Sequence, residues 1–162
     1  MVTIGIKFQS LKIFDIIFWV IKMFLISTKG RYALRVMLDL AAQDAEKIIS
    51  LEEISARQGI SRKYLETIIN ILVQNGLLKG KRGKSGGYRL TRQPSEYTVG
   101  EILDLTEITL SAVECLSKEN NTCERKSQCL TLPLWERFNK MAHDFFYSVT
   151  LQDILDEKIA VS

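Results

Sequence analysis

Residues 50–92 read SLEEISARQGISRKYLETIINILVQNGLLKGKRGKSGGYRLTR. The first part predicts a short amphipathic helix that begins at Leu51, where Ser50 can cap the first turn, and ends at Gly59. Its apolar residues are Leu51, Ile54 and Ala56. We therefore expect a tight turn at Gly59 and a second helix immediately after it.

The second helix follows Ser61, which we expect to cap it, and ends at Asn75-Gly76. Its apolar residues recur at helical spacing: Leu65, Ile68, Ile69, Leu72 and Val73. Two strands, 77–81 and 88–91, then flank a basic, glycine-rich turn. This order predicts a mainly α fold with a small β-wing, a winged helix-turn-helix of the kind that binds double-stranded DNA.

Charge is divided unevenly along the 162 residues. Residues 28–92 carry 13 Lys and Arg against 6 Asp and Glu, a balance of +7, whereas residues 93–162 carry 6 against 12, a balance of −6. The basic half suits a surface that neutralises phosphates. The sequence has one histidine, and Gly83-Lys84-Ser85 lacks the upstream glycine of a phosphate-binding loop. We therefore predict no catalytic residues and no enzyme.

The amino-terminal 22 residues form a separate feature. Residues 13–26 are mostly apolar, but Asp15 and Lys22 interrupt the run, which is shorter than the ~20 apolar residues of a membrane span. No small-residue cleavage site follows. The favoured interpretation is an extension outside the fold, the others being an amphipathic helix or a membrane segment. We expect no membrane association, a cytoplasmic protein, and a functional chain from Met23 onward.

All three cysteines, Cys115, Cys123 and Cys129, lie in one fifteen-residue window rich in polar residues. This setting argues against buried core thiols. An odd number of thiols in a DNA-binding protein of the reducing cytosol also argues against a disulfide framework. Thiolates on one loop suit a soft metal, either zinc or an iron–sulfur cluster, and the spacing alone leaves both open.

A long helix with a broad apolar face is expected from Pro133 onward. Its apolar stripe consists of Leu134, Phe138, Met141, Phe145 and Val149, widened by Trp135, Ala142 and Phe146. One small winged helix cannot cover so broad a face, whereas a second copy can, so we predict a homodimer. The expected parts are a leader (1–22), the DNA-binding domain (23–107), a cysteine-bearing effector loop (108–132), and the dimerisation helix with the C-terminal segment (133–162).

Several motifs together resemble the IscR/NsrR/CymR superfamily of bacterial winged-helix regulators. They are MFLISTKGRYAL (23–34), QGISRKYLE (58–66), NGLL (75–78), RGKSGGY (82–88), VGEI (99–102) and TLQDI (150–154). The resemblance spans about residues 23–157. It implies a transcriptional regulator, closest to the IscR-like iron–sulfur members, that binds a pseudo-palindromic operator as a two-fold symmetric dimer.

In such motifs the start of the second helix enters the major groove. The candidate contacts are Ser61, Arg62, Lys63, Tyr64, Glu66 and Thr67. Arg62 can read guanine through two hydrogen bonds, and Lys63 can bind phosphate. Glu66 has two interpretations: it accepts a hydrogen bond from a cytosine amino group, or it pairs with Arg62 four residues earlier. The resemblance implies that a glutamate at this position discriminates between operator classes.

The wing and the first helix supply further candidates. In the wing these are Arg82, Lys84, Ser85, Gly86 and Gly87, and the resemblance implies that Arg82 enters a narrow minor groove. Lys29 and Arg31, at the start of the first helix, are candidates for phosphate contacts.

The resemblance also favours an iron–sulfur cluster, 2Fe–2S or 4Fe–4S, over zinc at the three cysteines. This sequence departs from the family at the fourth ligand. Leu132 stands where the best-known member has histidine, and Arg31 stands where another member has an acidic ligand. His143 lies about 15 Å of helical rise beyond Pro133, so we expect it at a surface or interface. Other candidates are Glu114, Glu119, Glu124, a group of the partner subunit or a small exogenous molecule.

A different class of function stays open at this point. The same fold could serve an accessory or partner-regulated protein with structural zinc or no metal, which the leader could tether to a membrane. Colour separates the two classes, because a cluster protein is brown and a zinc protein is colourless.

Overall fold

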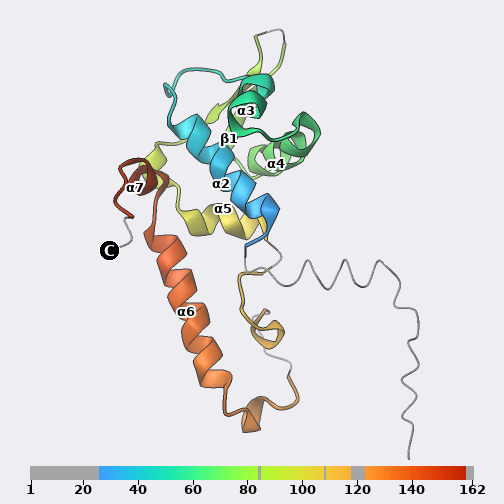
Figure 1. The fold of residues 1–162 in the computed structure, drawn as a ribbon, viewed down its shortest axis with the longest axis vertical. Helices are drawn as coiled ribbons and strands as arrows, with labels where there is room; N and C mark the ends of the chain where they lie inside the picture. The colour runs from blue at the N-terminus through green and yellow to red at the C-terminus, as the bar shows by residue number, and fades with distance from the viewer. Residues whose placement is uncertain (1–25, 84, 108, 118–122, 160–162) are drawn as a thin grey trace, which may run out of the picture.

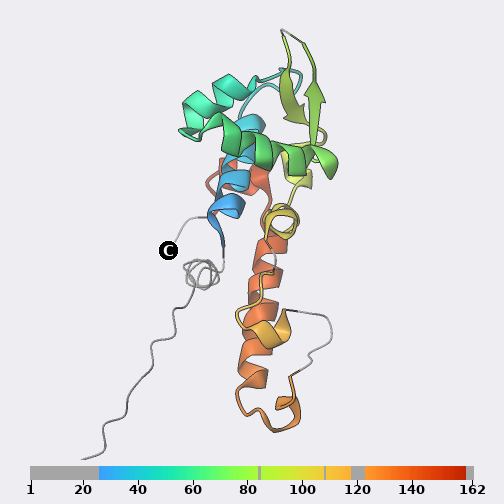
Figure 2. The same cartoon turned by 90° about the vertical axis from the view of Figure 1, so that its right-hand side faces the viewer.

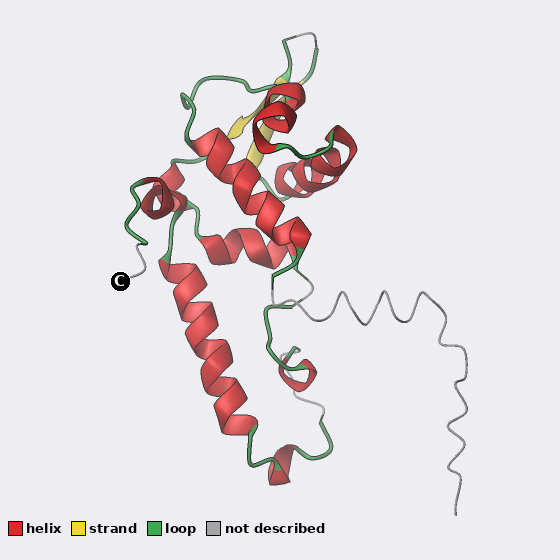
Figure 3. Cartoon of the chain, in the orientation of Figure 1, coloured by secondary structure: helices red, strands yellow, loops and turns green. Residues whose placement is uncertain are grey.

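The computed structural model describes residues 26–83, 85–107, 109–117 and 123–159 (Figure 1). The helices are α2 (Thr28–Ala41), α3 (Leu51–Gln58), α4 (Arg62–Gln74), α5 (Val99–Thr106), α6 (Leu132–Ser148) and α7 (Leu151–Leu155). Three short 3-10 helices are η1 (Pro94–Glu96), η2 (Glu114–Leu116) and η3 (Lys126–Gln128). Strand β1 (Leu78–Lys81) pairs antiparallel with β2 (Gly87–Leu90). Figure 3 shows this mainly helical chain with its small hairpin, which confirms the predicted fold class. The leader (1–22), Lys84 and Glu119 lie outside the described residues.

Local sequence explains where the helices of the helix-turn-helix begin and end. At α3, Ser50 Oγ accepts from the Glu53 N–H at 3.2 Å, and the Glu53 carboxylate accepts from the Ser50 N–H at 2.8 Å. This reciprocal cap confirms the role predicted for Ser50. The helix ends at Gly59, whose φ of 63° is left-handed, as expected. Ala56 is exposed, so its assignment to the apolar face was wrong.

Helix α4 begins directly after Ser61, as predicted. Ser61 occupies the capping position, but no capping hydrogen bond from its side chain is found among the described residues, and backbone bonds to its carbonyl close the first turn. The predicted capping position is therefore confirmed, but without a side-chain hydrogen bond. Strand β1 begins one residue later than predicted, because the Leu77 N–H donates to the Leu72 carbonyl at the end of α4. Strand β2 lies one residue earlier than predicted at both ends, and Gly87 pairs with Lys81.

Helices α2, α3 and α4 enclose the main core. Its fully buried members include Ala33, Val36, Met37, Ile54, Leu65, Ile68, Ile69 and Leu72. A buried carboxylate also joins α2 to α3: both Asp39 oxygens accept from the Arg57 guanidinium at 2.8 Å. Burial alone would raise the pKa of Asp39, but hydrogen bonds from Arg57 and Gln58 and the Arg57 charge outweigh it and lower this pKa.

Tyr97 fastens the base of the wing. Its ring is fully buried, and its hydroxyl accepts from the N–H groups of Thr91 (2.9 Å) and Arg92 (2.8 Å) and donates to the Leu77 carbonyl (2.9 Å). One phenol therefore connects the chain just before β1 with the chain just after β2. Tyr97 was not among the residues singled out from the sequence.

We expect Tyr97→Phe to lower the free energy of unfolding by roughly 1–3 kcal/mol, because the part-buried N–H of Arg92 loses its bond to the hydroxyl and the Thr91 N–H keeps only its longer bond to the Leu77 carbonyl. Denaturant unfolding measures this loss. Tyr88→Phe is the matched control, since no side-chain hydrogen bond of Tyr88 is found in the described part of the chain, and it should change stability little. Equal stability of the two variants would contradict the role of the Tyr97 hydroxyl.

Helix α6 extends away from the body that contains α2 to α5 (Figures 1 and 2). At its root the Tyr147 ring packs on Gly100 of α5, where a β-carbon would come within 2.4 Å of the ring. The Tyr147 hydroxyl donates to Asp104, and this hydrogen bond raises the pKa of Tyr147 to about 12. Tyr147 thus fixes α6 to α5.

The chain after α6 returns to the body. Leu151 of α7 is fully buried in the main core, and its N–H donates to the Tyr97 carbonyl at 3.0 Å. Val149 is buried in its own chain, and its carbonyl accepts from the Val99 N–H at 2.9 Å. Its assignment to the dimer stripe was therefore wrong, because α6 ends at Ser148 and the chain becomes extended there.

Candidate nucleic-acid interface and cysteine loop

The first two turns of α4 present most of the predicted DNA contacts to solvent. Ser61, Arg62, Lys63, Glu66 and Thr67 are exposed. Tyr64 is half-buried, and its ring packs edge-on against that of Tyr32 in α2, with 5.8 Å between ring centroids. The start of α4 is thus held against α2, while its polar side chains remain accessible to a groove of DNA.

Arg62 forms an ion pair with α3 rather than within α4. Its Nη2 lies 2.9 Å from Glu52 Oε1, and both side chains are about 60% exposed. The alternative pairing of Arg62 with Glu66 was therefore wrong. Surface ion pairs contribute little net stability, so Arg62 can exchange Glu52 for a base edge or a phosphate at low cost. Glu66 remains available for the predicted interaction with cytosine.

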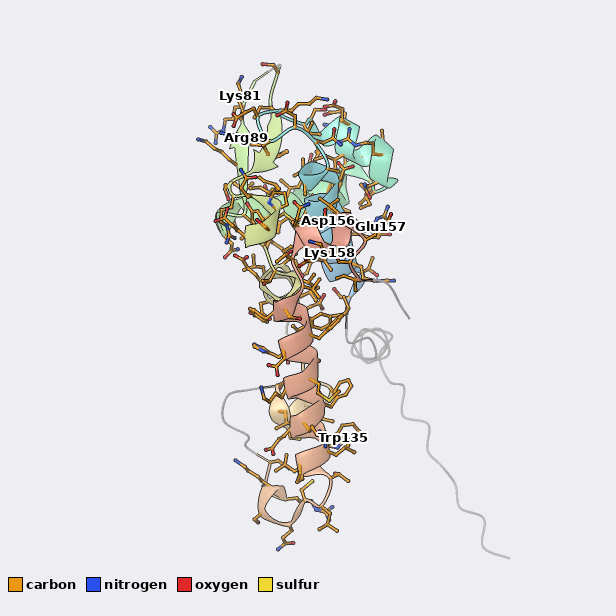
Figure 4. The ribbon with its side chains drawn as sticks, turned by 90° about the vertical axis from the view of Figure 1, so that its left-hand side faces the viewer. Lys81, Arg89, Trp135, Asp156, Glu157 and Lys158 are labelled. Atoms are coloured by element: carbon orange, nitrogen blue, oxygen red, sulfur yellow. The ribbon has the colours of Figure 1, made fainter. Side chains whose placement is uncertain are left out.

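The wing carries several exposed cations on β1 and directly after it. Lys79, Lys81 and Arg82 are exposed, and Figure 4 shows Lys81 and Arg89 at the end of the molecule opposite Trp135 of α6. Exposed Ser85 lies at the tip, followed by half-buried Gly86 and buried Gly87.

Gly87 anchors the wing to the segment before α3. Ile49 and Tyr88 form an antiparallel bridge with N–O distances of 3.0 and 2.8 Å. A β-carbon at Gly87 would lie 2.2 Å from the Ile49 carbonyl oxygen. The wing can therefore reach this position only with glycine there, so Gly87 is needed for the shape of the wing.

The start of α2 carries the remaining candidates. Arg31 is exposed and donates to Thr28 Oγ1 at 3.2 Å, and Lys29 is half-buried. One turn later, Arg35 Nε donates to Gln58 Oε1 at 3.1 Å, at the end of α3. These contacts were not predicted from the sequence, and they connect the first helix to the helix-turn-helix.

The cysteine loop lies between α5 and α6. Cys115 and Cys129 are half-buried, and Cys123 is exposed. Hydrogen bonds from Thr131 lower the pKa of Cys129, which favours the thiolate form that binds metals. Within the described residues, no three Cys, His, Asp or Glu side chains converge as a metal site requires. The donor set itself, two half-buried thiols and one exposed thiol on one loop, suits a soft-metal centre such as an iron–sulfur cluster or zinc.

Helix α6 exposes the predicted apolar stripe. The exposed fractions are 59% for Leu134, 42% for Phe138, 60% for Met141 and 53% for Phe145. Neighbouring Leu130 is 97% exposed. His143 is 65% exposed and stacks on Tyr147 with 4.4 Å between ring centroids, so it lies at the surface of α6, as expected.

Residues 26–157 match the model of the Rrf2 family, whose description is iron-dependent transcriptional regulator. The chain belongs to the Rrf2 family. A helix-turn-helix regulator of this type from Neisseria meningitidis is 41% identical over 133 residues, which are 82% of this chain and 88% of that protein. IscR of Pectobacterium atrosepticum is 36% identical over 133 residues, 82% of this chain and 80% of IscR.

Solved structures agree with this assignment. The structure of CymR, the global cysteine regulator of Bacillus subtilis, has a TM-score of 0.68 and 33% identity, and the match covers 83% of this chain and 98% of CymR. The resemblance to the IscR/NsrR/CymR superfamily is thereby confirmed. This Rrf2 protein is a DNA-binding transcriptional regulator and not an enzyme. Among the described residues, no helix is both long and apolar enough to cross a membrane.

Proposed function

We propose that this Rrf2 protein is a cytoplasmic homodimer whose binding to a pseudo-palindromic operator is modulated by an iron–sulfur cluster on Cys115, Cys123 and Cys129. The observation that carries the proposal is the position of the cysteine loop. It connects α5, which packs on α2 and α4, to α6, which exposes the apolar stripe. A change in the loop can therefore alter the spacing of two recognition helices in a dimer.

The three thiols would hold the cluster, and a fourth ligand would come from Glu114, Glu119, Glu124, the partner subunit or an exogenous molecule. When bound, the cluster would supply a centre that reacts with oxygen or nitric oxide. The lowered pKa of Cys129 supports its part in ligation, because only the thiolate binds iron well.

The DNA-binding part of the proposal rests on α4 and the wing. We expect Arg62→Ala and Arg82→Ala each to weaken binding of an operator, selected from random duplexes, by about 1–3 kcal/mol. Lys63→Ala should weaken binding to operator and random duplexes alike and reduce the salt dependence. Titrations of labelled duplexes over a salt series measure all three.

The matched control is Lys140→Ala, which removes an exposed cation of α6 that pairs with Asp144. It should leave operator affinity unchanged. If both arginine variants bound the operator with wild-type affinity, the proposed docking of α4 and the wing on DNA would be ruled out.

A further inference from the structure

Glu107 connects two segments that are 80 residues apart in the sequence. It follows α5 directly, and its N–H donates to the Leu103 carbonyl at 2.8 Å. Its side chain turns toward α2: Glu107 Oε1 accepts from Ser27 N at 3.1 Å and from Ser27 Oγ at 2.8 Å. Ser27 is the residue that caps α2. The carboxylate thus joins the start of the cysteine-bearing segment to the start of the first helix.

Three residues are needed for this contact. Ser27 Oγ accepts from the Gly30 N–H at 3.1 Å, so the capping hydroxyl is itself held in place by Glu107. A β-carbon on Gly30 would lie 2.0 Å from Glu107 Oε1, so the carboxylate occupies space that only glycine leaves. A negative group at this end of a helix is also favoured by the partial positive charge there.

The turn that Glu107 holds carries Lys29 and Arg31, the predicted phosphate contacts of α2. On its other side, Glu107 leads into the loop that contains Cys115. We propose that Glu107 is a positioning residue: it sets the first turn of α2 against the DNA backbone and makes that turn respond to the cysteine loop. This inference rests on the proposed function, because it uses the same DNA contacts and the same loop.

The test uses the full-length protein, purified without oxygen, and measures operator affinity over a salt series. Glu107→Ala should weaken operator binding roughly tenfold and reduce the salt slope by about one to two phosphate contacts. Glu107→Gln removes the same charge but keeps an oxygen acceptor, so its salt slope should be close to that of the wild type. Gly30→Ala should act like Glu107→Ala, and the double variant should be no worse than either alone.

A second measurement addresses the loop. In the wild type, the ratio of operator affinities before and after iron removal with a chelator reports the response to the cluster. Glu107→Ala should move this ratio toward one. If iron removal left the operator affinity of the wild type unchanged, the ratio would be one and cluster modulation in the proposed function would fail. The salt slope of the Glu107 variants would then decide whether Glu107 positions the first turn of α2.

Asp153 provides the matched control. It accepts from the N–H and hydroxyl of Thr150, the cap of α7, at 3.1 and 2.6 Å, in the same manner as Glu107 at α2. Asp153→Ala should lower thermal stability without changing the salt slope or the iron-dependent ratio. The inference is overturned if Glu107→Ala behaves as Asp153→Ala does, with lower stability but an unchanged slope and ratio.

Discussion

Met141→Glu should convert the protein into monomers and weaken operator binding by about 100-fold or more. The change places a carboxylate in the middle of the apolar stripe of α6, where Met141 is 60% exposed in the single chain. In a dimer interface that carboxylate would be buried without a partner, which is costly. A monomer also loses contact with the second half-site. Linking two binding events in one molecule raises the overall affinity by factors of about 10²–10⁴, and the monomer lacks this gain.

Sedimentation and duplexes with one or two half-sites measure this effect. The variant should bind a duplex with two half-sites no more tightly than a duplex with one half-site. Lys140→Glu is the control: it adds a carboxylate one residue away on the polar side of α6, where Lys140 is 77% exposed. It should remain dimeric. A Met141→Glu protein that stayed dimeric with full operator affinity would refute the stripe as the interface.

Replacing Cys115, Cys123 or Cys129 with serine should remove the visible absorbance of the anaerobically purified protein and alter its operator binding. A serine hydroxyl stays protonated near neutral pH, so it is a poor substitute for a thiolate ligand. Absorbance spectra with iron and sulfide analysis measure the loss. A colourless wild-type protein that contains zinc would instead support the structural-metal alternative.

His143→Ala is the control for the cysteine variants, because the exposed imidazole stacks on Tyr147 in α6. Its spectrum should match that of the wild type. If this variant lost the spectrum, a ligand donated across the dimer would become the leading model for the fourth site.

Local sequence was sufficient to predict the helix-turn-helix. The capping box at Ser50 and the left-handed turn at Gly59 depend on residues within three or four positions of each other. The wing was predicted for the same reason, because its turn composition is local. Ser61 occupies the predicted capping position without a side-chain hydrogen bond, because a residue type favoured at helix starts does not ensure that its hydroxyl turns toward the backbone.

Contacts between distant segments could not be predicted from the sequence. Arg62 pairs with Glu52 across the turn, and Glu107 binds Ser27 over 80 residues. Val149 fits the helical period of α6, yet the helix stops one residue earlier because the backbone pairs with Val99. The spacing of the three cysteines predicted one shared loop, but no local pattern gives the positions of thiols relative to one another.

The return of α7 to the body also determines the order in which this chain can fold during synthesis. Leu151 fills the core beneath Tyr97, but the ribosome makes it only after all of α6. The core of the nascent winged helix therefore stays incomplete until the whole of α6 has emerged. A fragment that stops before α6 would lack Leu151 permanently. The core of the DNA-binding body and the exposed apolar stripe of α6 are thus completed at nearly the same moment of translation.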